Sequence, residues 1–406
     1  MATYLMRLLQ QLAWLPLCLV AWAYPRDDRL WVFGAWHGRQ YADNARYLYR
    51  HVRDREPTLR AVWLARDPEV VRQVAKEGGE AELAYSWRGI RVALRAGVFL
   101  VTHSSEDVNA HASLGGRLIN LTHGTPLKRM GNDARALRND VMTRLFERYL
   151  RHLLPGKRRA EMMLVASEVG QQRMTSAFDL PFERVVPLGY PRWDAFDEGG
   201  GELLRGQGID PDAYSGILLY APTLRLRGRG ELDLAQGDRL ERLLPWLAAE
   251  RLLLLIRGHA SLKMSGVQAL LAGGSPWLRE APVSMFPDVN TLLPAVDGLI
   301  TDYSSLMYDY ACLNRPIILM APDLDDYLNG DVGIYGDYLA DAPGPVIDHW
   351  QQLPDAWREI HSDEHQARLS DFVIRHASLH DGRVCARATA VVQALLAGRE
   401  PRCSMS

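Results

Sequence analysis

The chain alternates short apolar runs with longer segments in which apolar residues recur at helical spacing. Up to residue 190, six runs have the length and composition of buried strands: 30–36, 61–65, 98–103, 117–124, 162–167 and 185–190. Segments such as DNARYLYRHVRD and PEVVRQVAKEGG lie between them and have helical periodicity. This strand–helix–strand repetition predicts a parallel sheet with right-handed crossovers.

The pattern restarts after a glycine-rich break at 198–208, with the sequence EGGGELLRGQG. A second set of apolar runs predicts a second sheet, and these runs lie at 217–223, 252–259, 298–305 and 316–322. The polar stretch 194–214 is the expected hinge. We therefore predict an α/β fold with two doubly wound, Rossmann-like domains at 25–197 and 210–345, a catalytic cleft between them and a helical tail at 346–406.

An apolar segment at 8–24, flanked by arginines, precedes the first domain. It is about as long as a minimal membrane span, but two glutamines and a proline weaken it as one. A signal peptide fits poorly because Tyr24 is followed by Pro-Arg rather than by a small-residue cleavage site. An interfacial helix, a helix buried against the first domain and a true span all remain open. Trp14 and Trp22 favour the first, so we predict a membrane-associating helix at 1–24.

Composition and charge narrow the classes of function. Hydrophobic residues make up 48% of the 406 residues and charged residues 24%, which is typical of a globular protein. A formal net charge of −2 argues against a nucleic-acid binder. The sequence has four scattered cysteines, Cys18, Cys312, Cys385 and Cys403. None has zinc-site spacing, which indicates a reducing compartment and no structural metal. The acidic run DLDD at 323–326 is the one place where a metal ion would be sought.

A strongly basic segment runs from residue 127 to residue 159. Its ten lysines and arginines outweigh three acidic residues, which gives a local net charge of +7. An apolar stripe at helical spacing runs through 141–150, with arginines lying off it. Such a basic amphipathic helix could meet anionic lipid or a polyanionic acceptor, or it could be a solvated face.

Polar clusters follow five of the predicted strands. They are THGTPLKRMG at 122–131, GYPRWD at 189–194, APTLR at 221–225, RGH at 257–259 and TDYSSLMYD at 301–309. One polar cluster after a strand is common in α/β folds, but five across two domains favour ligand sites.

Two clusters in the second domain carry chemistry suited to phosphate. Ser304 and Ser305 begin a predicted helix whose free N–H groups could hold a phosphate, although Ser304 could instead only cap the helix. Arg257 can contact two oxygens of a pyrophosphate at once. His259 could donate to the same oxygens or protonate a leaving phosphate, or it could be structural.

The histidine of the first domain lies in a short, stiff turn. Gly124 and Pro126 would hold His123 at the end of its strand. An imidazole placed there could act as a general base for an alcohol, which contributes about 10²–10⁴ in rate. The alternative is a histidine whose ring is satisfied by neighbouring backbone groups.

These clusters, in this order, resemble the CDP-glycerol glycerophosphotransferase family of teichoic-acid synthesis. The resemblance runs from about Pro25 to Tyr338 and includes HGTPLK together with TDYSS and Asp309, which is a specific combination. It implies a GT-B-like fold, CDP-glycerol as donor and CMP as leaving group. The short length and the N-terminal apolar segment are similar to the primase-type members of the family. Thr122 stands where the family usually has tryptophan.

The resemblance also implies roles for individual residues. The catalytic residues would be His123, which takes the proton of the acceptor hydroxyl, and His259, which stabilises charge on the CMP side. Asp309 would bind hydroxyls of ribose or glycerol. The implied donor-binding residues are Leu121, Thr122, Gly124, Thr125, Arg192, Pro222, Thr223, Arg257, Gly258, Ser304, Ser305 and Asp309.

The expected partners follow from the same resemblance. They are a CDP-glycerol or CDP-ribitol donor, a lipid-linked or polymeric saccharide acceptor and an anionic membrane surface, with no cofactor, no metal and no nucleic acid. The expected location is the cytoplasmic face of the cell membrane, as a peripheral or monotopic protein. A glycosyltransferase that uses a nucleotide sugar on the same scaffold is the rival enzyme. A non-catalytic membrane scaffold is the rival of another class, and the presence of both histidines, the arginines and both serines argues against it.

Overall fold

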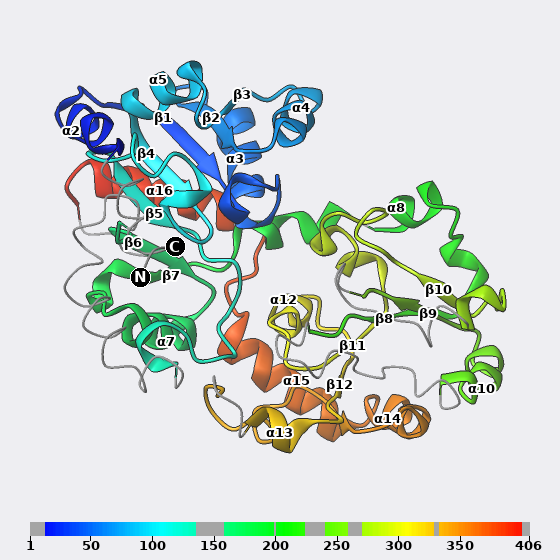
Figure 1. The fold of residues 1–406 in the computed structure, drawn as a ribbon. Helices are drawn as coiled ribbons and strands as arrows, with labels where there is room; N and C mark the ends of the chain where they lie inside the picture. The colour runs from blue at the N-terminus through cyan, green and yellow to red at the C-terminus, as the bar shows by residue number, and fades with distance from the viewer. Residues whose placement is uncertain are drawn as a thin grey trace. The chain divides into compact units, whose positions relative to one another are not determined.

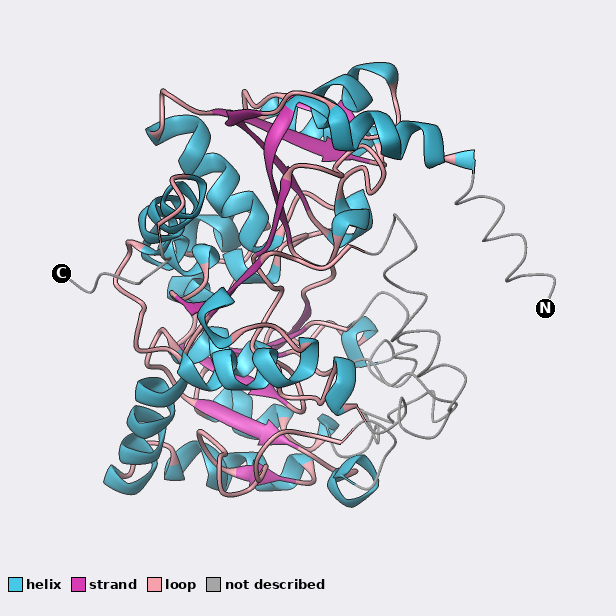
Figure 2. Ribbon diagram, turned by 90° about the vertical axis from the view of Figure 1, so that its left-hand side faces the viewer, coloured by secondary structure: helices cyan, strands magenta, loops and turns pink. Residues whose placement is uncertain are grey.

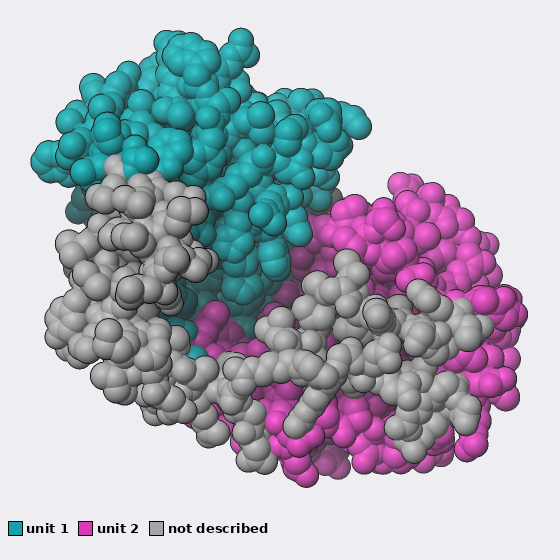
Figure 3. All heavy atoms as spheres, in the orientation of Figure 1, with its two compact units in different colours: residues 1–125, 131–194, 379–406 teal, residues 126–130, 195–378 magenta. Residues whose placement is uncertain are grey.

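The computed structural model describes residues 13–134, 158–198, 200–223, 240–258, 270–328 and 333–399. The chain divides into two compact units, which Figure 3 colours teal and magenta. Unit 1 comprises residues 1–125, 131–194 and 379–406, and unit 2 comprises residues 126–130 and 195–378.

Unit 1 is built on a sheet of seven described strands, all parallel, in the order β3-β2-β1-β4-β5-β6-β7 (Figure 1). The strands are β1 (Asp27–Gly34), β2 (Arg60–Ala65), β3 (Ala81–Leu83), β4 (Ala96–Val101), β5 (Arg117–Asn120), β6 (Met162–Val165) and β7 (Val185–Pro187). The central strands are almost continuously apolar and buried, as expected when helices cover both faces of a parallel sheet.

The helices of unit 1 start at recognisable capping residues. Asp67 accepts a hydrogen bond from the Glu69 N–H at the start of α4, and Ser86 and Ser167 cap α5 and α7 in the same way. The described helices are α2 (Leu15–Ala23), α3 (Asp43–Arg55), α4 (Pro68–Lys76), α5 (Trp87–Arg95), α7 (Glu168–Phe178) and α16 (Val384–Leu396). Short 3₁₀ helices are η1 (Trp36–Gly38), η2 (Ser105–Asp107), η3 (Gly131–Asp133) and η7 (Phe182–Arg184), and η8 (Pro191–Glu198) crosses the boundary between the units.

Unit 2 repeats the same plan with six described parallel strands in the order β10-β9-β8-β11-β12-β13. They are β8 (Gly216–Tyr220), β9 (Leu252–Ile256), β10 (Leu278–Glu280), β11 (Gly298–Thr301), β12 (Ile317–Met320) and β13 (Val346–Ile347). Figure 2 shows helices flanking the strands. The described helices are α8 (Gly201–Gly206), α10 (Leu244–Ala249), α12 (Leu306–Ala311), α13 (Leu324–Leu328), α14 (Leu353–Glu359) and α15 (Asp363–His376), with η9 (Pro211–Ala213), η10 (Val289–Thr291), η11 (Leu293–Ala295) and η12 (Trp350–Gln352).

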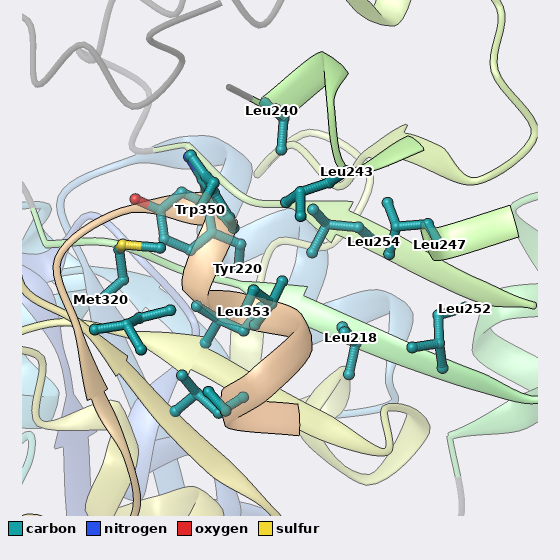
Figure 4. Packing of buried hydrophobic residues seen from close by; sticks show 14 of the residues in the cluster. Leu218, Tyr220, Leu240, Leu243, Leu247, Leu252, Leu254, Met320, Trp350 and Leu353 are labelled. Carbon is teal, nitrogen blue, oxygen red and sulfur yellow. The ribbon is translucent and has the colours of Figure 1, made fainter. Parts of the chain in front are cut away.

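Each unit has its own hydrophobic core. In unit 1, buried side chains of β1, β2, β4 and β5 form one cluster, against which Leu17 of α2 also packs. In unit 2, β8 and β9 contribute Leu218, Tyr220 and Leu254 to a cluster that Trp350 and Leu353 cover (Figure 4). All residues of the first cluster belong to unit 1, and all residues of the second belong to unit 2.

The sequence-based fold is confirmed in its main feature, two α/β units with parallel sheets. The C-terminal segment is divided between them, since α14 and α15 belong to unit 2 and α16 to unit 1. Near the N-terminus the described helix is α2, and residues 1–12 lie outside the described residues. Among the helices that the structure describes, none has the length and apolarity needed to cross a bilayer.

Candidate active site

The strand order creates a switch point in unit 1, between β1 and β4. These neighbouring parallel strands are connected in opposite directions along the sheet, and α/β proteins commonly bind ligands at the carboxyl ends of such strands. η1 follows β1 and η2 follows β4, so both turns lie at this edge. Gly34 ends β1 so close to the Asp107 carbonyl that a side chain there would clash with it at 2.4 Å.

A buried carboxylate, Asp107, joins the two turns. One of its oxygens accepts the His37 N–H at 2.7 Å, and the other accepts the N–H groups of Thr102 and His103 at 2.9 and 2.8 Å. The Thr102 hydroxyl donates to the same carboxylate at 3.3 Å. Burial raises the pKa of Asp107, and the three backbone N–H groups oppose that shift.

Aromatic rings converge above this carboxylate. The imidazoles of His103 and His123 stack with their centroids 4.3 Å apart and their planes within 6° of parallel. The Trp36 ring is tilted against the His103 ring, with their centroids 4.7 Å apart, and its centroid lies 6.2 Å from that of His123. Trp36 is 38% exposed. Trp36 and His37 both have positive φ, at 50° and 55°, a conformation that is uncommon for such residues and that concentrates at functional sites.

The turn that carries His123 is fixed by side chains from other elements. Thr122 has a φ of 53°, and its N–H donates to the Asn120 side chain at 2.7 Å. Asn44 of α3 donates to the carbonyls of Leu121 and Thr122 at 3.1 and 2.9 Å. The left-handed turn after β5 is therefore stabilised by amide side chains on both sides.

An ion pair lies directly behind this turn. The Arg192 guanidinium pairs with Asp43 and donates to the His123 carbonyl at 3.0 Å, and both paired side chains are almost fully buried, at 2% and 6% exposure. Thr125 is also buried, and its hydroxyl donates to the Tyr190 hydroxyl at 3.3 Å. Gly124, which lies between His123 and Thr125 in the chain, is buried as well. The sequence-predicted residues of this half are thus brought together, and Arg192 acts on the backbone of the turn.

Burial and charge determine the protonation of the two rings. Burial lowers the pKa of His123, the neighbouring Arg192 charge lowers it further, and a hydrogen bond to the backbone of Thr102 opposes the shift. Burial lowers the pKa of His103 to about 3, with His123 and His37 acting in the same direction. Both rings are therefore neutral near pH 7, and a neutral imidazole can accept a proton.

Unit 2 has an equivalent switch point, between β8 and β11. Thr223 follows β8, and its N–H and hydroxyl donate to the Asp302 carboxylate after β11, at 2.9 and 2.6 Å. Pro222 is buried beside it. Tyr303 stacks on Tyr327 with a centroid distance of 3.6 Å, and its hydroxyl donates to Asp323 at 3.1 Å.

The serines of unit 2 lie at the start of α12. The Ser304 hydroxyl accepts the Leu306 N–H at 3.2 Å. The N-cap of α12 is Ser305, so Ser304 precedes the cap rather than forming it, as the alternative reading of the sequence had it. Ser305 is partly exposed, and its side chain makes no capping hydrogen bond. Asp309 is buried on the same helix, at 3% exposure.

Arg257 follows β9 at the same edge of the sheet. Its guanidinium donates to the carbonyls of Phe286 and Ala281, at 2.7 and 3.4 Å. Burial lowers its pKa, and Asp288 opposes the shift. Gly258 comes next in the chain and is partly exposed, while His259 lies outside the described residues. The predicted role of His259 stays a prediction.

Two further predictions concern the basic segment and metal binding. Residues 135–157, which include the expected basic amphipathic helix, lie outside the described residues. Within the described ranges there is no cluster of three or more His, Cys, Asp or Glu side chains suited to a metal ion. In the acidic run 323–326, Asp323 accepts the hydrogen bond from Tyr303.

Sequence reasoning missed His103, Trp36 and Asp107. The run VFLVTH at 98–103 ends on His103, so the signal was a histidine directly after a predicted strand, the same signal that singled out His123. Asp107 had no such signal because its partner His37 lies 70 residues away in the chain. Only the strand order brings these residues together.

Comparisons with known proteins show the family to which the chain belongs. The sequence model of the CDP-glycerol:poly(glycerophosphate) glycerophosphotransferase family matches residues 17–394. A teichoic acid poly(glycerol phosphate) polymerase of Staphylococcus epidermidis is 26% identical over 87% of this chain and 48% of its own length, so this chain spans about half of that relative. A teichoic acid glycerol-phosphate transferase of Staphylococcus aureus is 25% identical over 89% of this chain and 92% of its own length.

A solved structure is similar as well. It is the wall teichoic acid polymerase TagF, as a histidine-to-asparagine variant soaked with CDPG. The TM-score is 0.73 at 25% identity, over 92% of this chain and 90% of that chain.

Proposed function

Because the chain belongs to the CDP-glycerol:poly(glycerophosphate) glycerophosphotransferase family, we propose that it transfers glycerol phosphate from CDP-glycerol to a hydroxyl of a glycan acceptor. The acceptor oxygen forms a bond to the phosphorus that bears glycerol, the bond from that phosphorus to the bridging oxygen breaks, and CMP leaves. CDP-ribitol is the alternative donor, because the residues described do not separate the two alditols.

The observation that carries this proposal is the state of His123. Its ring lies at the switch point of unit 1, its carbonyl is held by Arg192, and burial together with the Arg192 charge favours the neutral form. A neutral imidazole at the carboxyl edge of a parallel sheet is suited to take the proton of an attacking hydroxyl. We assign His123 this role as general base.

We assign donor binding to the carboxyl edge of unit 2. Arg257 and the turn 304–305 lie after β9 and β11, next to the switch point. A permanently charged guanidinium and hydroxyl groups can neutralise a diphosphate as charge accumulates on the leaving CMP. His259 follows Arg257 by two residues and is assigned to the same task.

The acceptor is proposed to be a lipid-linked or polymeric saccharide, met at an anionic membrane surface on the cytoplasmic face. Support comes from α2, whose outward face exposes Leu15, Leu19, Val20 and Trp22. Trp87 of α5 is exposed next to Arg88 and Arg91. Exposed aromatic and basic side chains of this kind suit peripheral binding at a lipid interface.

Mass spectrometry of reaction products tests the reaction type. We expect the purified protein, given CDP-glycerol and a lipid-linked saccharide, to release CMP and to add one or more glycerol phosphate units to the acceptor. Parallel reactions with CDP-ribitol and with UDP-hexoses provide the comparison. Release of UDP with transfer of a sugar, and no CMP from either CDP-alditol, would identify a glycosyltransferase and refute the proposal.

A further inference from the structure

We propose that His103 and Asp107 are positioning residues that hold the His123 imidazole in one orientation and cover one of its faces. This inference rests on the proposed function, in which His123 is the general base. Neither residue belongs to the HGTPLK or TDYSS motifs of the sequence, and the resemblance assigns no role to either.

Asp107 fixes the backbone on both sides of the switch point. Its carboxylate accepts N–H groups from His37 in one turn and from Thr102 and His103 in the other. The first turn contains the two consecutive residues with positive φ, Trp36 and His37. A conformation of that kind persists only where surrounding contacts enforce it, and a fully buried carboxylate with three N–H donors is such a contact.

Thr102 transmits this restraint to both rings. Its hydroxyl donates to Asp107, so the His103 Nδ1, 2.9 Å from that hydroxyl oxygen, is the donor in the contact between them. The Thr102 backbone also interacts with the His123 ring, and this interaction raises the pKa of His123 against the effect of burial.

His103 then covers one face of the base. The two rings are nearly parallel at 4.3 Å, so water cannot enter between them. The charged and titratable groups around the pair are Arg192 with its partner Asp43, and His37, Glu106 and Asp107. Because the stacked partner is itself uncharged, it excludes water from His123 without adding a charge that would favour the imidazolium form.

Two variants of His103 separate ring cover from hydrogen bonding. His103→Ala removes the stacked ring and admits water, whereas His103→Phe keeps a flat ring in place but loses Nδ1. We expect the pKa of His123 to rise toward its ordinary value in His103→Ala, with a fall in kcat of about 10-fold. In His103→Phe we expect the pKa of His123 to stay low, with most of the activity retained.

Two readouts are taken on the full chain. Nuclear magnetic resonance of ¹³C-labelled histidine rings, with the His123 signal assigned through His123→Ala, follows the titration of His123 directly. The pH dependence of kcat/KM for CMP release from CDP-glycerol follows the same group in the reaction. The acidic limb should move to higher pH in His103→Ala and not in His103→Phe.

Two outcomes would overturn the inference: an unchanged His123 titration in His103→Ala, or equal changes in the alanine and phenylalanine variants. Asp107→Asn supplies a second test, because it weakens the hydrogen bonds that fix the two turns. We expect the His123 signal to broaden and its titration to shift, and both can be measured on a folded variant of lower stability. The titration needs no turnover. If the wild type released no CMP, the proposed function would fail, while the ring measurements would still decide whether His103 positions His123.

Discussion

At the scale of single residues, buried polar groups determine the geometry around His123. Asp43 and Arg192 are both nearly inaccessible, so neither charge can be stabilised by water, and each depends on the other. Arg192 also holds the His123 carbonyl, which couples the ion pair to the turn that carries the base. The same guanidinium is a donor-binding residue by resemblance, and the contacts described give it a role in supporting the turn.

The Asp43→Asn variant tests this dependence. It keeps the shape of the side chain, and asparagine tolerates the positive φ of 66° at this position as well as aspartate does. We expect a loss of about 3–5 kcal/mol in the free energy of unfolding, because the change removes one charge of a buried ion pair. Urea unfolding of the variant and the wild type measures this loss in the free energy of unfolding.

The matched control is Glu80→Gln, which neutralises an exposed carboxylate paired with Arg60 in the same unit. That change should cost about 1 kcal/mol or less, since an exposed ion pair contributes little. Equal losses in the two variants would contradict the dependence of Arg192 on Asp43.

At the scale of elements, apolar runs located the central strands and the edge strand β7, and missed the three other edge strands. β1, β4, β8 and β9 are continuously apolar toward their ends and were predicted from this property. β3, β10 and β13 were not, because each is two or three residues long and β3 and β10 contain charged residues such as Glu82 and Glu280. Strands at or near an edge are covered less and so tolerate polar residues.

The exposed face of α2 carries a prediction at this scale. Trp22 is 77% exposed on a helix whose other face packs against unit 1 through Cys18 and Ala21. We expect Trp22→Glu to reduce co-sedimentation with phosphatidylglycerol vesicles several-fold, since burial of tryptophan in the interface is replaced by a negative charge near anionic lipid.

The control is Phe182→Glu, which changes an exposed aromatic residue of unit 1 outside α2. It should bind vesicles as the wild type does. Equal binding by all three proteins would exclude α2 as the membrane-binding element.

At the scale of the whole molecule, the two units share one strand order, and each places polar residues at its switch point. The sequence could predict both sheets because their apolar runs are local signals. It could not assign α16 to unit 1, or residues 126–130 to unit 2, because the contacts that decide this lie far away in the chain. His123 was found by a local motif, and its neighbour His103 carried a similar local signal, whereas the contact of Asp107 with His37 depends on the strand order. The cleft expected between the two domains stays a prediction.

The central claim is that His123 takes the proton of the acceptor in transfer from CDP-glycerol. The most direct measurement compares CMP release and CDP-glycerol affinity in the wild type and in His123→Ala, by a CMP assay and by calorimetry. We predict that CMP release falls by about 10²–10⁴-fold, the usual contribution of a general base, while the Kd for CDP-glycerol stays within a few-fold of the wild-type value. If affinity and release are lost together, the ring binds the donor, and the assignment of His123 as the base is wrong.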